Sequence, residues 1–208
     1  MALNDLSFQV QPGEIVALTG PSGSGKTTLL SLLGCMSRPT SGNIYFKERN
    51  ISRLPERFLA RIRRESFGFV FQQYNLLRDH TVLENVMLPL YPTAASWKEL
   101  RRRAGDLLER FQLAGIQSKK IKLLSGGEQQ RVAIARALIA DPDVMIADEP
   151  TAHLDQKLSV ELLDILAALN SEGKTIIIAT HDPFIYDAAI IQRRMNLHHG
   201  QIDGDLVL

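Results

Sequence analysis

The residues from Gly20 to Thr28 are the strongest candidates for phosphate chemistry in the chain. They read GPSGSGKTT, and the first eight match the phosphate-binding pattern G-x-x-x-x-G-K-[ST] in full. Glycines let a backbone approach phosphate oxygens closely, and its N–H groups then turn inward as an anion site. Lys26 would reach the β- and γ-phosphates, and the Thr27 hydroxyl would ligate Mg²⁺. The predicted nucleotide-binding residues are Gly20, Pro21, Ser22, Gly23, Ser24, Gly25, Lys26, Thr27 and Thr28.

A pair of adjacent carboxylates, Asp148 and Glu149, follows the apolar run from Val144 to Ala147. The alternative to a functional role is a solvated strand end. In a chain that also carries a phosphate-binding loop, the functional interpretation is favoured. Asp148 would hold Mg²⁺, usually through water, while Glu149 would polarise the water that attacks the γ-phosphate. The residues therefore predict ATP and Mg²⁺ as the small molecules bound.

The elements that position these residues follow from the hydrophobic pattern. Four nearly continuous apolar runs predict strands buried on both faces of a parallel sheet, namely 14–19, 67–71, 144–147 and 175–179. The phosphate-binding loop lies between the first run and an apolar helix expected over 28–36. Leu6, Phe8 and Val10 alternate with polar residues, which predicts a half-buried strand before the turn at Pro12-Gly13. Strands separated by helical patterns predict an α/β fold with a parallel-sheet core.

Between the second and third runs, the pattern becomes helical. Thr81 to Glu84 and Ser125 to Glu128 both fit the capping box, in which a hydroxyl and a Glu satisfy free N–H groups at a helix start. No linker or repeat separates this part. We therefore expect one domain over 1–208, with a core of about 1–73 and 141–208 and an inserted helical subdomain of about 74–140.

The segment Leu124 to Gln130, LSGGEQQ, indicates a family. It resembles the signature motif of the ATP-binding cassette (ABC) ATPases. Gln72, His181 and Leu154-Asp155 fall where that family places its Q-loop, switch histidine and D-loop. The resemblance covers essentially the whole chain. It implies a P-loop NTPase (RecA-like) fold with a helical subdomain and a small antiparallel β part, and an ATPase that powers transport.

Ser125 would cap a helix whose N-terminus, with the amides of Gly126 and Gly127, forms an anion site. Simple helix capping is the plainer interpretation of these residues. The resemblance implies more: two copies pair head to tail, and this segment of one copy completes the ATP site built on the Lys26 loop of the other. Asp155 would lie at the dimer contact.

The resemblance also assigns a catalytic set of Glu149, His181 and Gln72. His181 would hydrogen-bond the γ-phosphate, although a single histidine is more often structural. Gln72 would sense Mg²⁺ and the γ-phosphate and relay that state to the permease, although alone it is simply a polar loop residue. The metal set is then Thr27, Gln72 and Asp148.

Within the family, RRESFGFVFQ over 63–72 followed by YNLL over 74–77 resembles the branch for macrolide export and lipoprotein release. Two segments depart from the family pattern. The residues before Leu6 include no aromatic to stack on adenine, so we expect weaker nucleotide affinity or a substitute ring. Ala152-His153 stands where this branch more often has a small polar pair, which predicts a less secure dimer contact through Asp155.

Charge and hydropathy limit the partners. Of 208 residues, 24 are Lys or Arg and 23 are Asp or Glu, so the net charge of +1 gives no long-range attraction to nucleic acid. The apolar runs are shorter than the roughly 20 residues of a membrane span. We expect a peripheral subunit on the cytoplasmic face of the inner membrane, bound to a second copy of itself and to an integral membrane permease. The alternatives are mechanical signalling through a membrane partner and a soluble ABC ATPase with no transport role.

Overall fold

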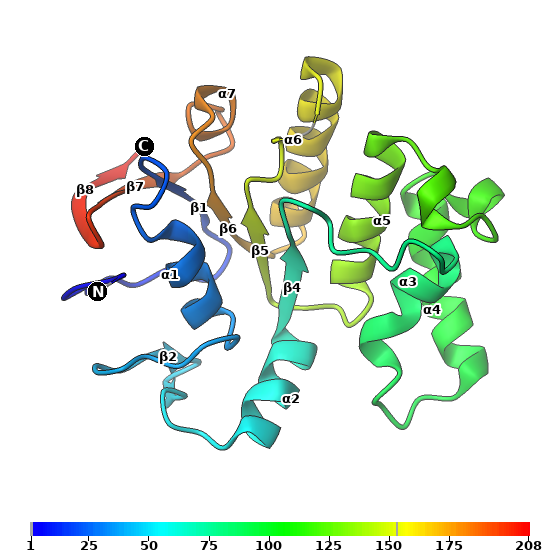
Figure 1. Cartoon of the computed structure of the whole chain (residues 1–208), viewed down its shortest axis with the longest axis horizontal. Helices are drawn as coiled ribbons and strands as arrows, with labels where there is room; N and C mark the ends of the chain where they lie inside the picture. Colours follow the sequence, from blue (N-terminus) through cyan, green and yellow to red (C-terminus); the bar gives the residue numbers. More distant parts are fainter. Residues whose placement is uncertain (1, 153) are drawn as a thin grey trace.

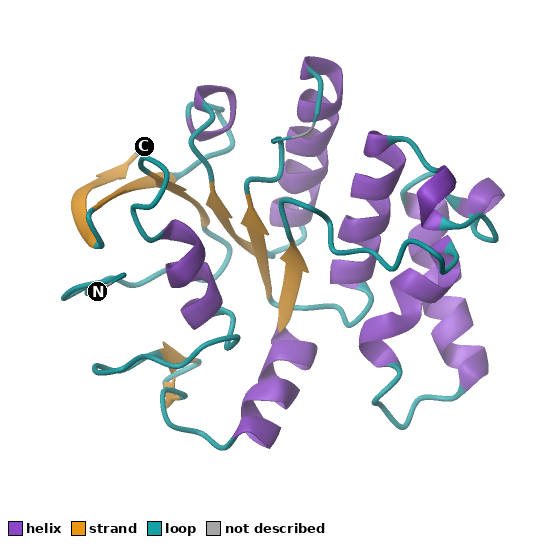
Figure 2. Cartoon of the chain, in the orientation of Figure 1, coloured by secondary structure: helices purple, strands orange, loops and turns teal. Residues whose placement is uncertain are grey.

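A six-stranded sheet forms the centre of the molecule, in a computed structural model that describes residues 2–152 and 154–208 (Figures 1 and 2). The strand order is β4-β5-β6-β1-β7-β8, and every neighbouring pair is parallel except the hairpin of β7 and β8. The strands are β1 (Ile15–Thr19), β4 (Phe67–Val70), β5 (Val144–Asp148), β6 (Thr175–Ala179), β7 (Arg193–His198) and β8 (Gln201–Val207). The four apolar runs are thus confirmed as strands.

The parallel strands are apolar throughout because both faces of the sheet are covered. Side chains alternate along a strand, so Ile15 and Ala17 pack in one core cluster with the helices that follow β4, while Val16 and Leu18 pack in the other with the helix after β1. All five residues of β1 are buried. This strand therefore fixes the start of the phosphate-binding loop firmly against the core.

Helices flank the sheet on both sides (Figure 2). Their bounds are α1 (Lys26–Leu33), α2 (Glu56–Ser66), α3 (Val82–Met87), α4 (Trp97–Arg110), α5 (Gly126–Leu138), α6 (Gln156–Ser171) and α7 (Pro183–Tyr186), with short 3₁₀ turns η1 (Leu88–Leu90), η2 (Ala114–Ile116) and η3 (Ile121–Leu123). A small antiparallel pair, β2 (Tyr45–Phe46) and β3 (Arg49–Asn50), completes the fold. No described helix has the length and apolar character of a membrane span.

The chain between β4 and β5 is helical, as the sequence indicates, and both predicted capping boxes form. Thr81 Oγ1 accepts from the Glu84 amide at 3.2 Å while Glu84 Oε2 accepts from the Thr81 amide at 2.7 Å. Ser125 and Glu128 make the same reciprocal pair at the start of α5. These bonds satisfy N–H groups that a helix start leaves free, so each helix begins at a defined residue.

Two expectations about local structure are wrong. Leu6, Phe8 and Val10 are partly buried in alternation, but residues 6–10 belong to no strand, because their backbone joins no ladder among the described residues. Gln9 instead accepts a bond from Arg193 Nη1 through its carbonyl at 2.6 Å. The helix expected over 28–36 begins at Lys26 and ends at Leu33. It ends there because the backbone leaves helical geometry: Gly34 is the C-cap, and Cys35 after it has a φ angle of 60°.

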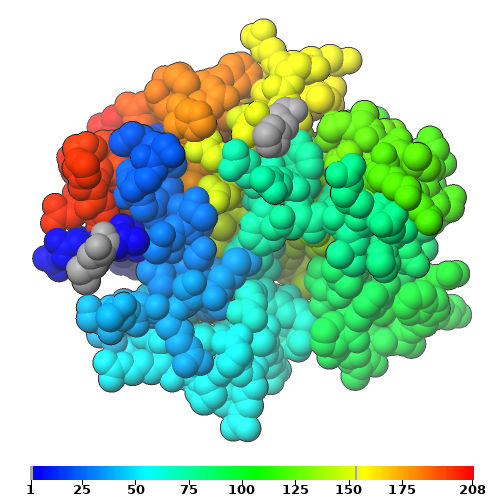
Figure 3. All heavy atoms as spheres, in the orientation of Figure 1, coloured from blue at the N-terminus to red at the C-terminus, as the bar shows by residue number. Residues whose placement is uncertain are grey.

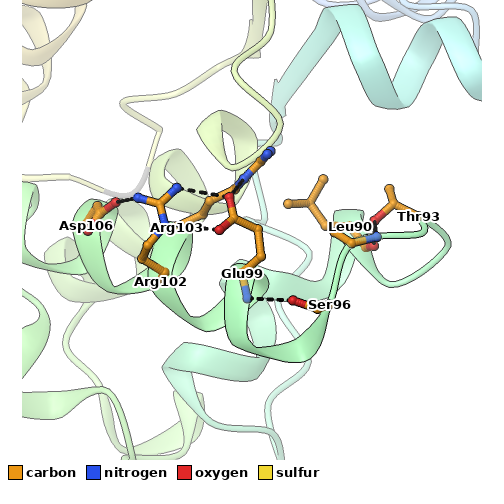
Figure 4. Close-up of polar contacts among 8 residues, drawn as sticks. Leu90, Thr93, Ser96, Glu99, Arg102, Arg103 and Asp106 are labelled. Carbon is orange, nitrogen blue, oxygen red and sulfur yellow. Dashed lines mark hydrogen bonds and ion pairs between the residues drawn. The ribbon is translucent and has the colours of Figure 1, made fainter.

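Charged side chains on α4 pair with each other at the surface (Figure 4). Arg102 bonds Glu99 and Asp106, and Arg103 bonds the same Glu99 carboxylate at 2.8 Å. Glu99 also donates its amide to Ser96, the residue that caps α4. The two arginines hold the pKa of Glu99 at about 2. The basic cluster at 101–103 is thus a solvated helix face.

We expect Glu99→Gln to change how the protein responds to acid. The pKa of Glu99 in the folded state, about 2, lies below its ordinary value of 4.5. Its contribution to stability is therefore full above pH 4.5 and is lost as the pH falls toward 2. Thermal unfolding should be measured at a series of pH values. The melting temperature of the wild type should exceed that of the variant at neutral pH, and the two melting temperatures should converge between pH 4.5 and 2. Glu109→Gln is the control, since Glu109 on the same helix forms no ion pair with a described residue. If the difference in melting temperature between wild type and Glu99→Gln at pH 7 persists unchanged below pH 3, the lowered pKa of Glu99 is contradicted.

Candidate nucleotide-binding site

Four of the predicted segments meet at one edge of the sheet. The phosphate-binding loop follows β1, Asp148-Glu149 ends β5, His181 follows β6, and Gln72 follows β4. These four strands are neighbours and parallel, so their carboxyl ends lie at the same edge. Ligands of open α/β sheets bind outside the carboxyl ends of the strands. The fold thus brings together residues that are up to 161 positions apart in the sequence, from Gly20 to His181.

The backbone of the loop after β1 has the shape that its glycines allow. Gly20, Gly23 and Gly25 have φ angles of 135°, 79° and 110°, in the region that L side chains rarely adopt. Gly20 is also sterically required, because an added Cβ would lie 2.1 Å from the carbonyl oxygen of Leu197 on β7. The two constraints hold the loop as a cradle above the sheet.

Lys26 is folded over this cradle. Its Nζ donates to the carbonyl oxygens of Gly20 at 2.7 Å and Pro21 at 3.1 Å, and the residue is only 7% exposed. The ammonium group therefore already lies where an anion held by the loop would need it. Pro21, Ser22 and Gly23 are exposed, so the loop is open to a ligand from outside.

The start of α1 adds a second set of donors to the same place. Its N-cap is Gly25, and no side chain caps the helix. The first amides of a helix carry a partial positive charge, and an uncapped start leaves them available to an anion. Ser24 Oγ is buried without a hydrogen-bond partner among the described residues. These features fit a bound phosphate group.

Thr27 and Asp148 lie side by side at this edge and line one pocket, although β1 and β5 are not neighbouring strands. Burial raises the pKa of Asp148, the hydrogen bond from Thr27 opposes that rise, and the nearby Glu149 charge adds to it. A half-buried carboxylate of this kind is stabilised by a cation. The described residues contain no group of three His, Cys, Asp or Glu side chains that could hold a metal alone. One carboxylate and one hydroxyl fit Mg²⁺, which keeps waters and shares substrate phosphates.

Glu149 is held by three contacts with the segment after β6. Its Oε1 lies 2.8 Å from His181 Nδ1, and its Oε2 accepts from the Thr180 hydroxyl at 3.2 Å and from the His181 amide at 3.4 Å. Its φ angle is 46°, a conformation in which a non-glycine residue is uncommon. Backbone strain of this kind concentrates at functional sites. The sequence prediction did not include Thr180, whose only signal was its place directly before His181.

Gln72 is exposed in the turn that follows β4. No hydrogen bond joins its side chain to a described residue. Figure 3 shows the segment after β4 covering the middle of the molecular face between α1 and the helices α3 to α5. The backbone of Gln72 thus lies at the predicted edge of the sheet, and its side chain remains available for a ligand. Tyr74 and Asn75, which come after Gln73 in the same turn, both have positive φ angles, of 57° and 49°.

Ser125, Gly126 and Gly127 lie apart from the phosphate-binding loop. Figure 1 shows α5 on the far side of β4 and β5 from α1. No hydrogen bond among the described residues links this turn to the loop at 20–28. Ser125 and Gly126 are exposed, and Asp155 is exposed at the start of α6, where it caps that helix. His153, in the predicted D-loop, lies outside the described residues.

Comparison with known proteins identifies the family. A sequence model of the ABC transporter family matches residues 3–152. The chain is 47% identical over 205 residues to the macrolide export ATP-binding/permease protein MacB of Rhodopseudomonas palustris (strain HaA2), covering 99% of this chain and 31% of that protein. It is 46% identical over 203 residues to an uncharacterized ABC transporter ATP-binding protein of Thermotoga maritima, covering 98% and 86%. The chain thus spans about a third of the MacB proteins it matches.

Two solved structures have the same fold. The dimeric ATP-binding cassette MJ0796, in a post-hydrolysis state bound to ADP and Pi, is 42% identical and superposes with a TM-score of 0.90 over 100% of this chain and 90% of that one. The cassette cbiO1 of Clostridium perfringens, described as part of the transporter complex cbiONQ, is 32% identical with a TM-score of 0.87, covering 98% and 81%. Sequence and structure agree along almost the whole chain, which therefore belongs to the ABC transporter family as its ATP-binding cassette, an ATPase.

Proposed function

We propose that two copies of this chain close around two Mg-ATP molecules and that their closure and reopening drive a membrane permease. The observation that carries the proposal is the convergence of the Lys26 loop, Asp148-Glu149 and His181 at one sheet edge. That edge presents hydrogen-bond donors for phosphate oxygens, a site suited to Mg²⁺, and a carboxylate positioned by a histidine. Together these groups are what γ-phosphate hydrolysis requires.

In this proposal each residue has a specific task. The loop amides and Lys26 bind the phosphates, and Thr27 and Asp148, with Gln72, would hold Mg²⁺. The ion would neutralise charge on the β- and γ-phosphate oxygens. Glu149 orients the attacking water and accepts its proton, and His181 keeps the Glu149 carboxylate in place through the 2.8 Å contact.

The exposed first turn of α5 is an argument for a dimer of this chain. Ser125 and Gly126 present a helix N-terminus to solvent, away from the phosphate-binding loop of the same chain. A partner chain that brings its own phosphate-binding loop to this turn would satisfy both surfaces. The 42% identical cassette MJ0796 is described as a dimer, which supports this arrangement. Asp155, at the start of α6, would lie in the same interface.

The permease and the cargo are proposed from the relatives. The MacB proteins combine an ATP-binding part with a permease in one chain, as their name states, and this chain matches about a third of their length. We therefore propose an integral membrane permease as the partner, export as the activity, and a place on the cytoplasmic face of the membrane. The sheet edge and α5 carry no information about the exported molecule.

The test is to purify the tagged chain from its native membranes in mild detergent, with and without ATP, and to identify what comes with it. We expect a polytopic membrane protein with two copies of this chain per complex. If ribosomes, nucleic acid or no partner is recovered, the transport role is wrong, although the ATPase chemistry stands. A membrane partner with no transport activity in reconstituted vesicles would favour mechanical signalling.

A further inference from the structure

A buried arginine near the end of α5 holds the loop that carries Gln72. Arg136 is only 8% exposed. Its Nη1 donates to the carbonyl oxygen of Asn75 and its Nη2 to that of Tyr74, each at 2.6 Å. No carboxylate among the described residues forms an ion pair with it. Both terminal nitrogens of the guanidinium group therefore donate to the backbone of one loop.

The two carbonyls that Arg136 binds belong to residues in an unfavourable conformation. Tyr74 and Asn75 have φ angles of 57° and 49°, and a bulky residue such as Tyr rarely adopts positive φ. Asn adopts this region more readily, but a strained residue such as Tyr74 persists only where its surroundings impose the conformation. The guanidinium group binds two oxygens with a rigid, planar geometry, which a lysine ammonium lacks. Arg136 thus stabilises the left-handed backbone conformation of Tyr74 and Asn75.

The packing of α5 on β4 does not require Arg136. The helix α5 already packs tightly on β4 without it, since a Cβ added at Gly68 would lie 2.6 Å from the carbonyl oxygen of Ala137. Burying a charge without a carboxylate is also costly, and burial lowers the pKa of Arg136. An apolar side chain at this position would leave the carbonyl oxygens of Tyr74 and Asn75 without these donors, so the buried charge serves the loop.

The helix joins this loop to the segment expected to meet the second copy. Its N-cap is Ser125, and at 1.5 Å per residue Arg136 lies about 16 Å from Ser125 along the helix axis. Near its start, Gln130 Nε2 donates to the carbonyl oxygen of Pro150, directly after Glu149. One rigid element therefore contacts the Glu149 segment near one end and the Gln72 loop near the other.

We infer that Arg136 is a positioning residue that fixes the Gln72 loop to α5, so that Gln72 and the first turn of α5 move together. This inference rests on the proposed role of Gln72 at the Mg²⁺ site. Through this link, contact of Ser125 with a second copy would set the position of Gln72. Loss of the link would leave the loop free and the Mg²⁺ site incomplete.

The first test measures the loop itself, without nucleotide. Hydrogen–deuterium exchange is compared for wild type, Arg136→Lys and Arg136→Gln, because neither replacement can bind both carbonyls in the same way. We expect the amides of Tyr74 and Asn75, which donate to Phe71 and Gln73, to exchange about tenfold faster. Arg103→Lys on α4 is the matched control and should change nothing there. Unchanged exchange in a folded variant would overturn the inference, as would failure of both variants to fold.

The second test separates this inference from the proposed function. In Arg136→Lys, the Mg²⁺ concentration for half-maximal ATP hydrolysis should rise about tenfold, with nucleotide affinity in EDTA unchanged. Gln72→Ala should produce the same shift, and the double variant should show no further one. If Gln72→Ala alone leaves the Mg²⁺ dependence normal, the proposed role of Gln72 fails. If it shifts the dependence and Arg136→Lys does not, only the present inference fails.

Discussion

Lys26→Ala should abolish tight ATP binding. In the structure, Lys26 supplies the side-chain ammonium at the loop, and it also holds the carbonyls of Gly20 and Pro21 in place. The substitution therefore removes a charge and releases the loop. Deleting a charged hydrogen-bond donor costs about 3 kcal/mol, which corresponds to a loss of affinity of about 100-fold. A titration with a fluorescent ATP analogue, followed by displacement with ATP, measures this directly.

The control for that experiment is Lys47→Ala. Lys47 is 65% exposed and pairs with Asp143 at 2.9 Å, so the same substitution removes a charge from the same domain outside the loop. We expect ATP affinity within about twofold of wild type in the control, since exposed pairs contribute little. If Lys26→Ala binds ATP as tightly as the control does, the loop does not bind phosphates through this residue.

Glu149→Gln should retain ATP binding and lose turnover. The amide has the same shape as the carboxylate and can keep the contacts with Thr180 and His181, but it cannot accept a proton from water. Loss of a general base lowers kcat by about 10² to 10⁴-fold. Because Glu149 does not line the phosphate-binding loop, nucleotide affinity should change by no more than about threefold.

Steady-state phosphate release and equilibrium nucleotide binding, measured on the same preparation, test this prediction. Glu172→Gln is the matched control, because Glu172 pairs with Arg110 at the surface, at 2.6 Å, and has no role at the sheet edge. Wild-type hydrolysis in Glu149→Gln would remove this residue from the catalytic set. Loss of ATP binding together with turnover would instead show that the carboxylate, held by Thr180 and His181, maintains the site.

Much of the fold could be predicted because its signals are local. The runs that became β1, β4, β5 and β6 are apolar on both faces, and a strand covered on both sides must be so. Both capping boxes formed as predicted, since their partners lie three residues apart. The segment at 6–10 shows the limit of such signals. Its side chains alternate as predicted, but a strand also needs a partner for its backbone, which the sequence pattern does not reveal.

The sequence by itself determined the chemistry that the phosphate-binding loop and the Asp148-Glu149 pair can perform, because these groups act through neighbouring residues and fixed spacing. Only the tertiary structure decided which distant groups would meet. The contact of Glu149 with Thr180 and His181 depends on β5 and β6 being neighbours in the sheet. The contact of Arg136 with the Tyr74 and Asn75 carbonyls depends on where α5 packs against β4. Contacts of this kind are set by strand order and helix packing, which arise from the whole chain and not from any one segment.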